Sequence, residues 1–480
     1  MLRTALRRMT RNSAPALART QAVAAHMSTS APDAQPVLFE SRGTMRQYIL
    51  NREKKLNALN TEMLDILRPQ LEEWSKSDLC KVVVGSGLGR AFCAGGDVAT
   101  VLKDSLNDAT RPNSIAFFRS EYELDYILSV LPKSYIALLD GITMGGGVGL
   151  AISAPFRVAT EKTVFAMPET KIGFCPDVGA SFFLSRMDGQ VGTYLALTSE
   201  TLVGREVFEH GFATHYIPST SIPTLMARLA DLDNPTPELI DRAIEELHAE
   251  RQPNDAAGKF TGKTRQALDS AFSHDTVEDI VKSLEAFASH EDTGVRDWAK
   301  ATLETLRMRS PTSLKVALAA VRRGKKLSLL ESLQMEMGIA TAYCSGASPD
   351  FRTGISAVLI DKTQGRPTWT PDSIDQVTPE IVDRFFNKSS TYVASSPQLT
   401  PPPELRNKNK DPMRFALPTE ATINDTINSL SSGGSVPLSE VLAKFDDLRS
   451  GKNGIKEKVM DVVQRRYKLV DQGGNQFIQS

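Results

Sequence analysis

Short hydrophobic runs, separated by loops rich in glycine and polar residues, divide the first part of the chain. Each run has the length of a buried strand, and the second run is rich in valine and is followed by a glycine cluster. The predicted strands span residues 45–50, 81–85, 135–139, 156–159 and 164–166.

A helix is predicted at residues 113–131, between the second and third strands, and Pro132 ends it. Its apolar positions recur at helical spacing: Ile115, Phe118, Tyr122, Tyr126 and Val130. Residues 141–147 predict a turn, and residues 148–154 predict the start of another helix. This repeated order of strand, loop and helix predicts an α/β core with parallel strands and right-handed crossovers, in which ligands bind where loops leave the strand ends.

The second half of the chain is predicted to be mainly helical, from residue 199 to 326 and again from 350 to 362. Arg366 and Pro367, followed by Trp369 and Pro371, are predicted to end the compact part. After Lys388 the chain becomes rich in serine and proline, so residues 389–480 are predicted to be a linker followed by a helical extension. An amphipathic helix is indicated there by Ile455, Val459, Val462, Val463 and Val470. Its apolar face must pack against its own core, a second subunit or another partner.

The first residues have the composition of a targeting segment. Arginines alternate with alanine, leucine, serine and threonine, and no acidic residue precedes Asp33. This composition is typical of a mitochondrial transit peptide, so residues 1–32 are predicted to direct the protein to the mitochondrial matrix.

Composition excludes several classes of protein. The formal net charge of −1 gives no electrostatic reason to expect DNA or an anionic membrane as the main partner. The most apolar stretch, residues 135–159, is interrupted by Asp140 and several glycines, which favours a buried strand and helix over a membrane span. The four cysteines are scattered singly, which fits a reducing compartment: Cys80, Cys93, Cys175 and Cys344.

Candidate chemistry is concentrated in two glycine-containing loops and the carboxylates that follow them. Residues 91–97 and residues 145–147 place small residues before predicted helix starts, and Glu169 and Asp177 lie downstream. One N–H from each loop could bind a carbonyl oxygen as an oxyanion hole, whereas either loop alone would be explained by tight helix packing. No Gly-x-Ser-x-Gly motif is present, and the six histidines lack metal-ligand spacing, which argues against a serine triad or a zinc mechanism.

These motifs resemble a known family. Residues 91–97 and 141–150 resemble the crotonase superfamily of enoyl-CoA hydratases and isomerases. Within it, residues 165–170, 174–179 and 357–362 are similar to its 3-hydroxyisobutyryl-CoA hydrolase branch. The resemblance covers residues 37–386 and implies a spiral of stacked ββα units, helices that cap an acyl pocket, and a coenzyme A thioester as substrate.

The resemblance also implies roles for individual residues. The oxyanion donors correspond to the amides of Gly96 and Gly146. The acid–base carboxylate corresponds to Glu169, and a second carboxylate typical of the hydrolase branch corresponds to Asp177. A substrate-contacting glutamate that follows a Phe-Phe-Arg sequence corresponds to Glu121, for which the alternative is an exposed helix position.

Coenzyme A requires basic partners for its phosphates and a cleft for adenine. The basic residues Lys54, Lys55 and Arg90 lie on loops expected to flank that cleft, and the backbone of Ala94 matches the adenine-binding position of the superfamily. Each basic side chain could equally be a solvated surface charge. Coenzyme A is part of the substrate, so no dissociable cofactor and no metal are expected.

One departure from the hydratase pattern discriminates between functions. Hydratases carry a second catalytic glutamate two residues after the glycine triplet, where this chain has Gly149. Hydrolysis of 3-hydroxyisobutyryl-CoA in valine breakdown is therefore favoured over hydration or isomerisation. The alternative without enzyme activity is a structural role in the mitochondrial small ribosomal subunit. The nearly balanced charges of residues 389–480 give no strong indication of RNA binding.

Overall fold

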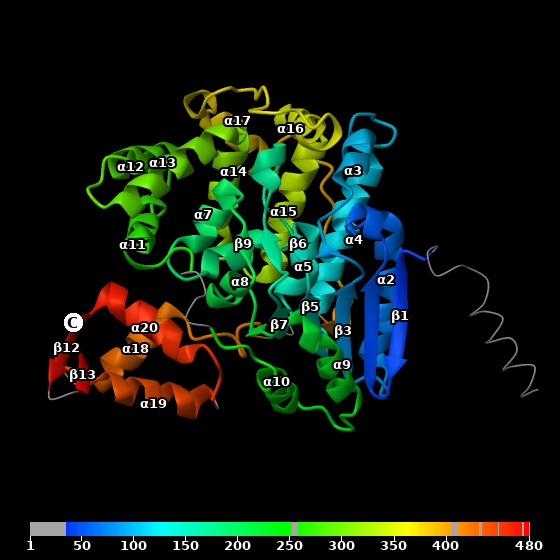
Figure 1. Ribbon diagram of the computed structural model, residues 1–480. Helices are drawn as coiled ribbons and strands as arrows, with labels where there is room; N and C mark the ends of the chain where they lie inside the picture. Colours follow the sequence, from blue (N-terminus) through cyan, green and yellow to red (C-terminus); the bar gives the residue numbers. More distant parts are fainter. Residues whose placement is uncertain are drawn as a thin grey trace, which may run out of the picture.

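The computed structural model describes residues 35–251, 258–405, 411–431, 434–449, 451–472 and 475–479. The predicted transit peptide, residues 1–32, lies outside these described residues. Figure 1 shows a mixed α/β body, with helices α18, α19 and α20 of the C-terminal part on the side away from β1 and α2. No helix among the described residues has the length and apolar character needed to cross a membrane.

The main sheet has six strands in the order β1, β2, β3, β5, β7 and β10. They span Val37–Arg42, Met45–Leu50, Val82–Gly87, Ser134–Leu139, Phe156–Ala159 and His215–Tyr216. Neighbouring strands are parallel except for the antiparallel pair β1 and β2. The five predicted strands all exist, which confirms the parallel core.

A second sheet contains β4, β6, β8 and β9, at Ala91–Cys93, Ile142–Met144, Val164–Ala166 and Leu202–Val203. Three times the chain runs through a strand of the main sheet and then a strand of the second sheet before it turns into helical structure. The helical segments are α3 (Val98–Ser105) with α4 (Arg111–Ser129), α5 (Gly146–Ile152), and the 3₁₀ turn η3 (Glu169–Ile172). This repeat confirms the expected spiral of ββα units.

The glycine-rich segment differs from the prediction. Residues 142–144 were expected in a turn but form strand β6, which pairs with β4 and β8. Helix α5 begins at Gly146 rather than at residue 148, and Gly145 precedes it with φ of 48°. Glycine has no Cβ to clash at positive φ, so Gly145 allows the chain to pass directly from strand to helix.

Helices cover the sheets and form most of the remaining chain. Helix α4 is buried along nearly its whole length and packs against α2 (Thr61–Lys76), α3, α5 and α15. The other helices of this body are α6 (Ala180–Phe183), α7 (Val191–Thr198), α8 (Arg205–Glu209), α9 (Ile222–Ala230), α10 (Pro237–Glu245), α11 (Gly262–Ala271), α12 (Val277–Phe287), α13 (Thr293–Met308), α14 (Pro311–Gly324), α15 (Leu329–Cys344), α16 (Asp350–Ile355) and α17 (Pro379–Phe386).

The C-terminal part is a small helix and sheet unit. It contains α18 (Glu420–Leu430), α19 (Leu438–Arg449), α20 (Ile455–Arg466), and a sheet of β11 (Val436–Pro437), β13 (Asn475–Gln479) and β12 (Lys468–Gln472). The prediction of one amphipathic helix through Val470 was wrong at its end, because Val470 lies in β12 and pairs with Phe477. The apolar face of α20 is buried as expected.

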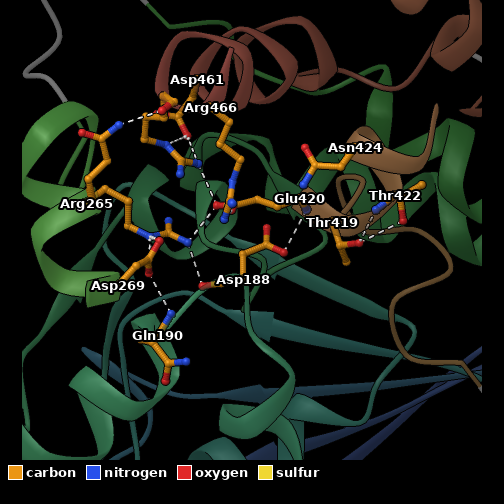
Figure 2. Close-up of polar contacts among 12 residues, drawn as sticks. Asp188, Gln190, Arg265, Asp269, Thr419, Glu420, Thr422, Asn424, Asp461 and Arg466 are labelled. Atoms are coloured by element: carbon orange, nitrogen blue, oxygen red, sulfur yellow. Dashed lines mark hydrogen bonds and ion pairs between the residues drawn. The ribbon is translucent and has the colours of Figure 1, made fainter. Parts of the chain in front are cut away.

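The extension folds back on its own chain. Glu420 of α18 is buried and accepts hydrogen bonds from Arg265 of α11, at 2.8 Å, and from Arg466, at 2.7 Å, as Figure 2 shows. The backbone N–H of Glu420 donates to Asp188 at 2.9 Å. A second contact joins Lys452 to Glu245 of α10. The amphipathic helix α20 itself packs against α11, α18 and α19 of this chain.

Candidate active site

The two glycine loops meet at the start of α5. A β-carbon placed on Gly146 would lie 3.4 Å from the amide nitrogen of Gly96, and one placed on Gly145 would lie 3.5 Å from the Cα of Gly95. Gly95 has φ of 110°, so both loops use positive φ at the point of contact. The geometry places the amides of Gly96 and Gly146 next to each other.

Both amides are available to a ligand. Gly146 is the first residue of α5, where an N–H group has no acceptor inside the helix. Within the described part of the chain, neither the Gly96 amide nor the Gly146 amide donates a hydrogen bond. Two adjacent unpaired N–H groups can stabilise negative charge on one oxygen.

Glu169 begins η3 directly after Pro168, two residues beyond the end of strand β8 at Ala166. Its side chain is buried, and Oε1 lies 3.0 Å from the position that a β-carbon on Gly145 would take. Oε2 has no hydrogen-bond partner among the described residues. Burial and the nearby Asp177 carboxyl raise the pKa of Glu169 well above its ordinary value.

Glu121 projects from α4 toward the same point. Among the described residues its buried Oε1 has no hydrogen-bond partner, and it would lie 2.2 Å from a β-carbon on Gly146 and 3.9 Å from one on Gly96. Burial and Asp177 raise the pKa of Glu121. Glu121 is therefore buried, and the alternative that it is an exposed helix residue is wrong.

Asp177 lies in the turn between η3 and α6. Its Oδ2 accepts a hydrogen bond of 2.6 Å from the hydroxyl of Tyr122. Burial raises the pKa of Asp177 to about 7, and the Tyr122 hydrogen bond acts in the opposite direction. Glu121, Glu169 and Asp177 thus form one electrostatically linked group of buried carboxyls.

Three further residues at this site were not predicted as functional. Tyr122 was interpreted as part of the apolar face of α4, because a tyrosine at helical spacing gives no sign of where its hydroxyl points. Asp125 is buried on α4, and neither of its oxygens has a hydrogen-bond partner in the part of the chain that the structure describes. Glu336 of α15 is buried close enough to interact with Asp177. The sequence did contain one sign of Asp125: it is an acidic residue among the apolar residues of a predicted helix.

Gly149 has no space for a side chain. A β-carbon there would lie 2.6 Å from Oδ2 of Asp125 and 2.7 Å from Cβ of Val178. A glutamate at this position would need both neighbours to move. The packing therefore agrees with the absence of the second carboxylate of the hydratase pattern.

The residues expected at the coenzyme A cleft lie on adjacent loops. Lys54 and Lys55 are exposed on the 3₁₀ turn η2 (Glu53–Lys55), and Arg90 is exposed on the loop between β3 and β4. A β-carbon on Gly89 would lie 2.6 Å from a Glu53 carboxylate oxygen, so the two loops are in contact. In the described residues, none of these three cations forms an ion pair, and the Ala94 amide donates to Leu56 O at 3.0 Å.

One group of potential metal ligands lies elsewhere, where strand β10 faces α10. It contains His215, Asp241 and Glu245, with His215 Nε2 at 2.9 Å from Asp241 Oδ1. Glu245 is already paired with Lys452 and accepts hydrogen bonds from Asn453. The Lys452 ammonium therefore already pairs with one of the two carboxylates of this group.

Comparison with known proteins agrees with this geometry. The enoyl-CoA hydratase/isomerase family model matches residues 45–386. The mitochondrial 3-hydroxyisobutyryl-CoA hydrolases of Danio rerio and Homo sapiens are 40% and 38% identical, and each alignment covers 77% of this chain and 94% of the relative. The small ribosomal subunit protein mS47 of Neurospora crassa is 43% identical over 90% of this chain and 85% of that protein.

Solved structures support the same assignment. A carnitinyl-CoA dehydratase from Mycobacterium thermoresistibile has a TM-score of 0.66 at 33% identity, covering 76% of this chain and 98% of that chain. An enoyl-CoA hydratase from Rhodobacter sphaeroides has a TM-score of 0.63 at 30% identity, covering 74% of this chain and 97% of that chain. The spiral of ββα units, the paired glycine amides and these matches together show that the chain belongs to the enoyl-CoA hydratase/isomerase family.

Proposed function

We propose that this protein hydrolyses the thioester of 3-hydroxyisobutyryl-CoA in mitochondria, as its relatives of that name do. The observation that carries the proposal is the meeting of the Gly96 and Gly146 amides with the Glu169 carboxyl, next to a glycine at position 149. Two amide donors suit a thioester carbonyl, and the acid–base carboxylate Glu169 without a second carboxylate at position 149 suits hydrolysis better than hydration of a double bond.

The thioester carbonyl oxygen accepts hydrogen bonds from both amides, so charge that develops on it in the transition state is stabilised. Each such donor is commonly worth about 2.7–4 kcal/mol. In a general-base route, Glu169 takes a proton from water while the oxygen of that water bonds to the carbonyl carbon. The bond from carbon to sulfur then breaks, and the coenzyme A thiolate takes the proton from Glu169.

In a second route, Glu169 itself attacks the carbonyl carbon, expels the thiolate and forms an anhydride that water cleaves. Hydroxylamine added during turnover separates the two routes, because it traps an anhydride as a hydroxamate. In both routes Asp177 and Glu121 are placed to bind the 3-hydroxyl group or to handle its proton.

The direct test is a thioesterase assay on purified protein with a small panel of acyl-CoAs. We expect thiol release from 3-hydroxyisobutyryl-CoA and 3-hydroxypropionyl-CoA, and little hydration of crotonyl-CoA. Hydration of crotonyl-CoA without thiol release would reject the hydrolase assignment. Activity on 3-hydroxyisobutyryl-CoA would place the enzyme in valine catabolism. The names of its relatives and the arginine-rich residues 1–32 support a location in the mitochondrial matrix.

A second candidate function is assembly with the mitochondrial small ribosomal subunit. The relative named mS47 aligns over 90% of this chain, so the alignment includes much of the C-terminal extension even if it begins at Met1. The hydrolases align over 77%. The extension therefore distinguishes this chain from the hydrolases and favours an additional role for it.

Sedimentation of mitochondrial lysate in high salt tests this role on the full chain. Co-migration with the small ribosomal subunit would support it, and migration as a small free oligomer would reject it. Truncation at Ser389 alone is an ambiguous control, since it removes Glu420 from the buried Arg265. Lys444→Glu changes an exposed residue of α19 and leaves the contact between Glu420 and Arg265 intact. It therefore tests whether the exposed surface of the extension binds the ribosomal subunit.

A further inference from the structure

The turn that carries Asp177 has an unusual backbone. Val178 has φ of 56° and Gly179 has φ of 89°, so two consecutive residues lie in the left-handed region. A β-branched residue at positive φ is strained and persists only where its surroundings hold it. Helix α6, which follows, has only four residues and offers little stability of its own.

Glu336 holds this turn from a distant helix. It lies on α15, is buried, and accepts three hydrogen bonds. Oε2 accepts from the Gly179 amide at 2.6 Å, and Oε1 accepts from the Ser181 amide at 2.8 Å and from the Ser181 hydroxyl at 2.6 Å. Both oxygens of the Glu336 carboxyl therefore accept hydrogen bonds from residues that follow Asp177.

We propose that Glu336 is a positioning residue that fixes the Asp177 carboxyl in the active site through the Val178–Ser181 backbone. The proposal rests on the hydrolase function proposed above, because Asp177 matters to catalysis only there. Asp177 is then held from two sides, by Tyr122 at its side chain and by Glu336 at its backbone.

The chemistry of the contact requires a carboxylate. Three donors converge on two oxygens, and glutamine would direct an N–H group at one of these donors. Burial raises the pKa of Glu336, and the hydrogen bonds from Ser181 and Gly179 oppose this effect because three donors stabilise the charged form. Replacing this carboxylate is therefore expected to release the turn without changing the side chain's size.

Glu336→Gln is the test, with Glu331→Gln as the matched control. Glu331 lies on the same helix but is exposed and caps its N-terminus. We expect kcat for 3-hydroxyisobutyryl-CoA to fall about 10- to 100-fold in Glu336→Gln, because a small misplacement of a catalytic group has effects of this size, and to stay unchanged in the control. An unchanged kcat in Glu336→Gln would overturn the proposal.

A double variant separates positioning from a general structural role. If Glu336 acts through Asp177, then Glu336→Gln should cause no further loss of kcat in an Asp177→Asn background. The same fold-loss in both backgrounds would contradict the proposal. Should Glu336→Gln fail to fold, Ser181→Ala removes one of the three donors and should give a smaller loss with the same dependence on Asp177.

Hydrogen exchange gives a readout that does not need turnover. The amides of residues 177–183 should exchange at least about tenfold faster in Glu336→Gln and at the wild-type rate in Glu331→Gln. Unchanged exchange would overturn the positioning role even if the wild-type enzyme is active. A wild-type protein with no thioesterase activity but with this change in exchange would instead reject the proposed function alone.

Discussion

The hydroxyl of Tyr122 donates a hydrogen bond of 2.6 Å to Oδ2 of Asp177, and both side chains are buried. This contact joins the middle of α4 to the turn before α6. It stabilises the ionised form of Asp177 and so opposes the burial that raises the pKa of this carboxyl to about 7. Tyr122 therefore sets both the position of Asp177 and its charge.

Tyr122→Phe should raise the pKa of Asp177, because the variant loses the hydrogen bond that favours the charged form. If ionised Asp177 is the active form, kcat/KM rises with pH as Asp177 loses its proton. This acidic limb of the pH profile should move to higher pH in the variant. At pH 7 the rate should fall roughly tenfold, the effect of a hydrogen bond to a charged group. Tyr126→Phe, on the same helix, is the control and should keep the wild-type profile; a wild-type profile in Tyr122→Phe would contradict this account.

Glu169→Gln should abolish thioester hydrolysis and leave the protein folded. The amide retains the shape of the side chain but cannot take a proton or form an anhydride, and loss of a general base commonly costs about 10²–10⁴-fold in rate. Thiol release and circular dichroism measure the two expectations. The exposed Glu62→Gln should behave as wild type, and retained activity in Glu169→Gln would reject Glu169 as the acid–base group.

Gly146→Ala should inactivate the enzyme, because its methyl group would lie 2.2 Å from Oε1 of Glu121 and would crowd the Gly96 amide. We expect kcat to fall by at least about 100-fold. Gly338→Ala, in the interior of α15, is a matched control, since its methyl group would meet Val393 at an ordinary 3.5 Å. The control should keep full activity and gain about 0.5–1 kcal/mol in stability, measured by urea unfolding.

Glu420→Gln should weaken the attachment of the C-terminal extension. Burial alone would raise the pKa of Glu420, but Arg265 and Arg465 lower it to about 2. The stabilisation is therefore fully present above the ordinary pKa of a glutamate and is lost as pH falls through about 2. Removing one partner of such a buried cluster costs about 3–5 kcal/mol.

Urea unfolding followed at several pH values measures this contribution. The difference between wild type and Glu420→Gln should be largest at neutral pH and should shrink as the solution is acidified from pH 5 toward pH 2. Glu440→Gln changes an exposed residue of α19 and should have little effect. A difference that stays constant with pH would contradict a role for the charge of Glu420.

Local patterns predicted much of the fold. The strands at residues 156–159 and 164–166 have the predicted limits, and the helix predicted at 113–131 is observed at Arg111–Ser129. Strand β6 was missed because the glycines on both sides of it indicated a turn, and pairing with β4 and β8 stabilises it. Val470 was assigned to a helix because its spacing fits the apolar face of one. Its pairing with Phe477 in the sheet is a tertiary contact that the spacing does not reveal.

The sequence by itself determined five strands, the helix that ends before Pro132, the glycine loops and the carboxylates Glu169 and Asp177, because backbone preference and motif spacing are local properties. Only the tertiary structure decided which side chains meet. Glu336 contacts the Gly179 amide across 157 residues of sequence, and Asp125 fills the space beside Gly149 from a different helix. Such contacts depend on how helices pack over the sheets, and no local pattern encodes that packing.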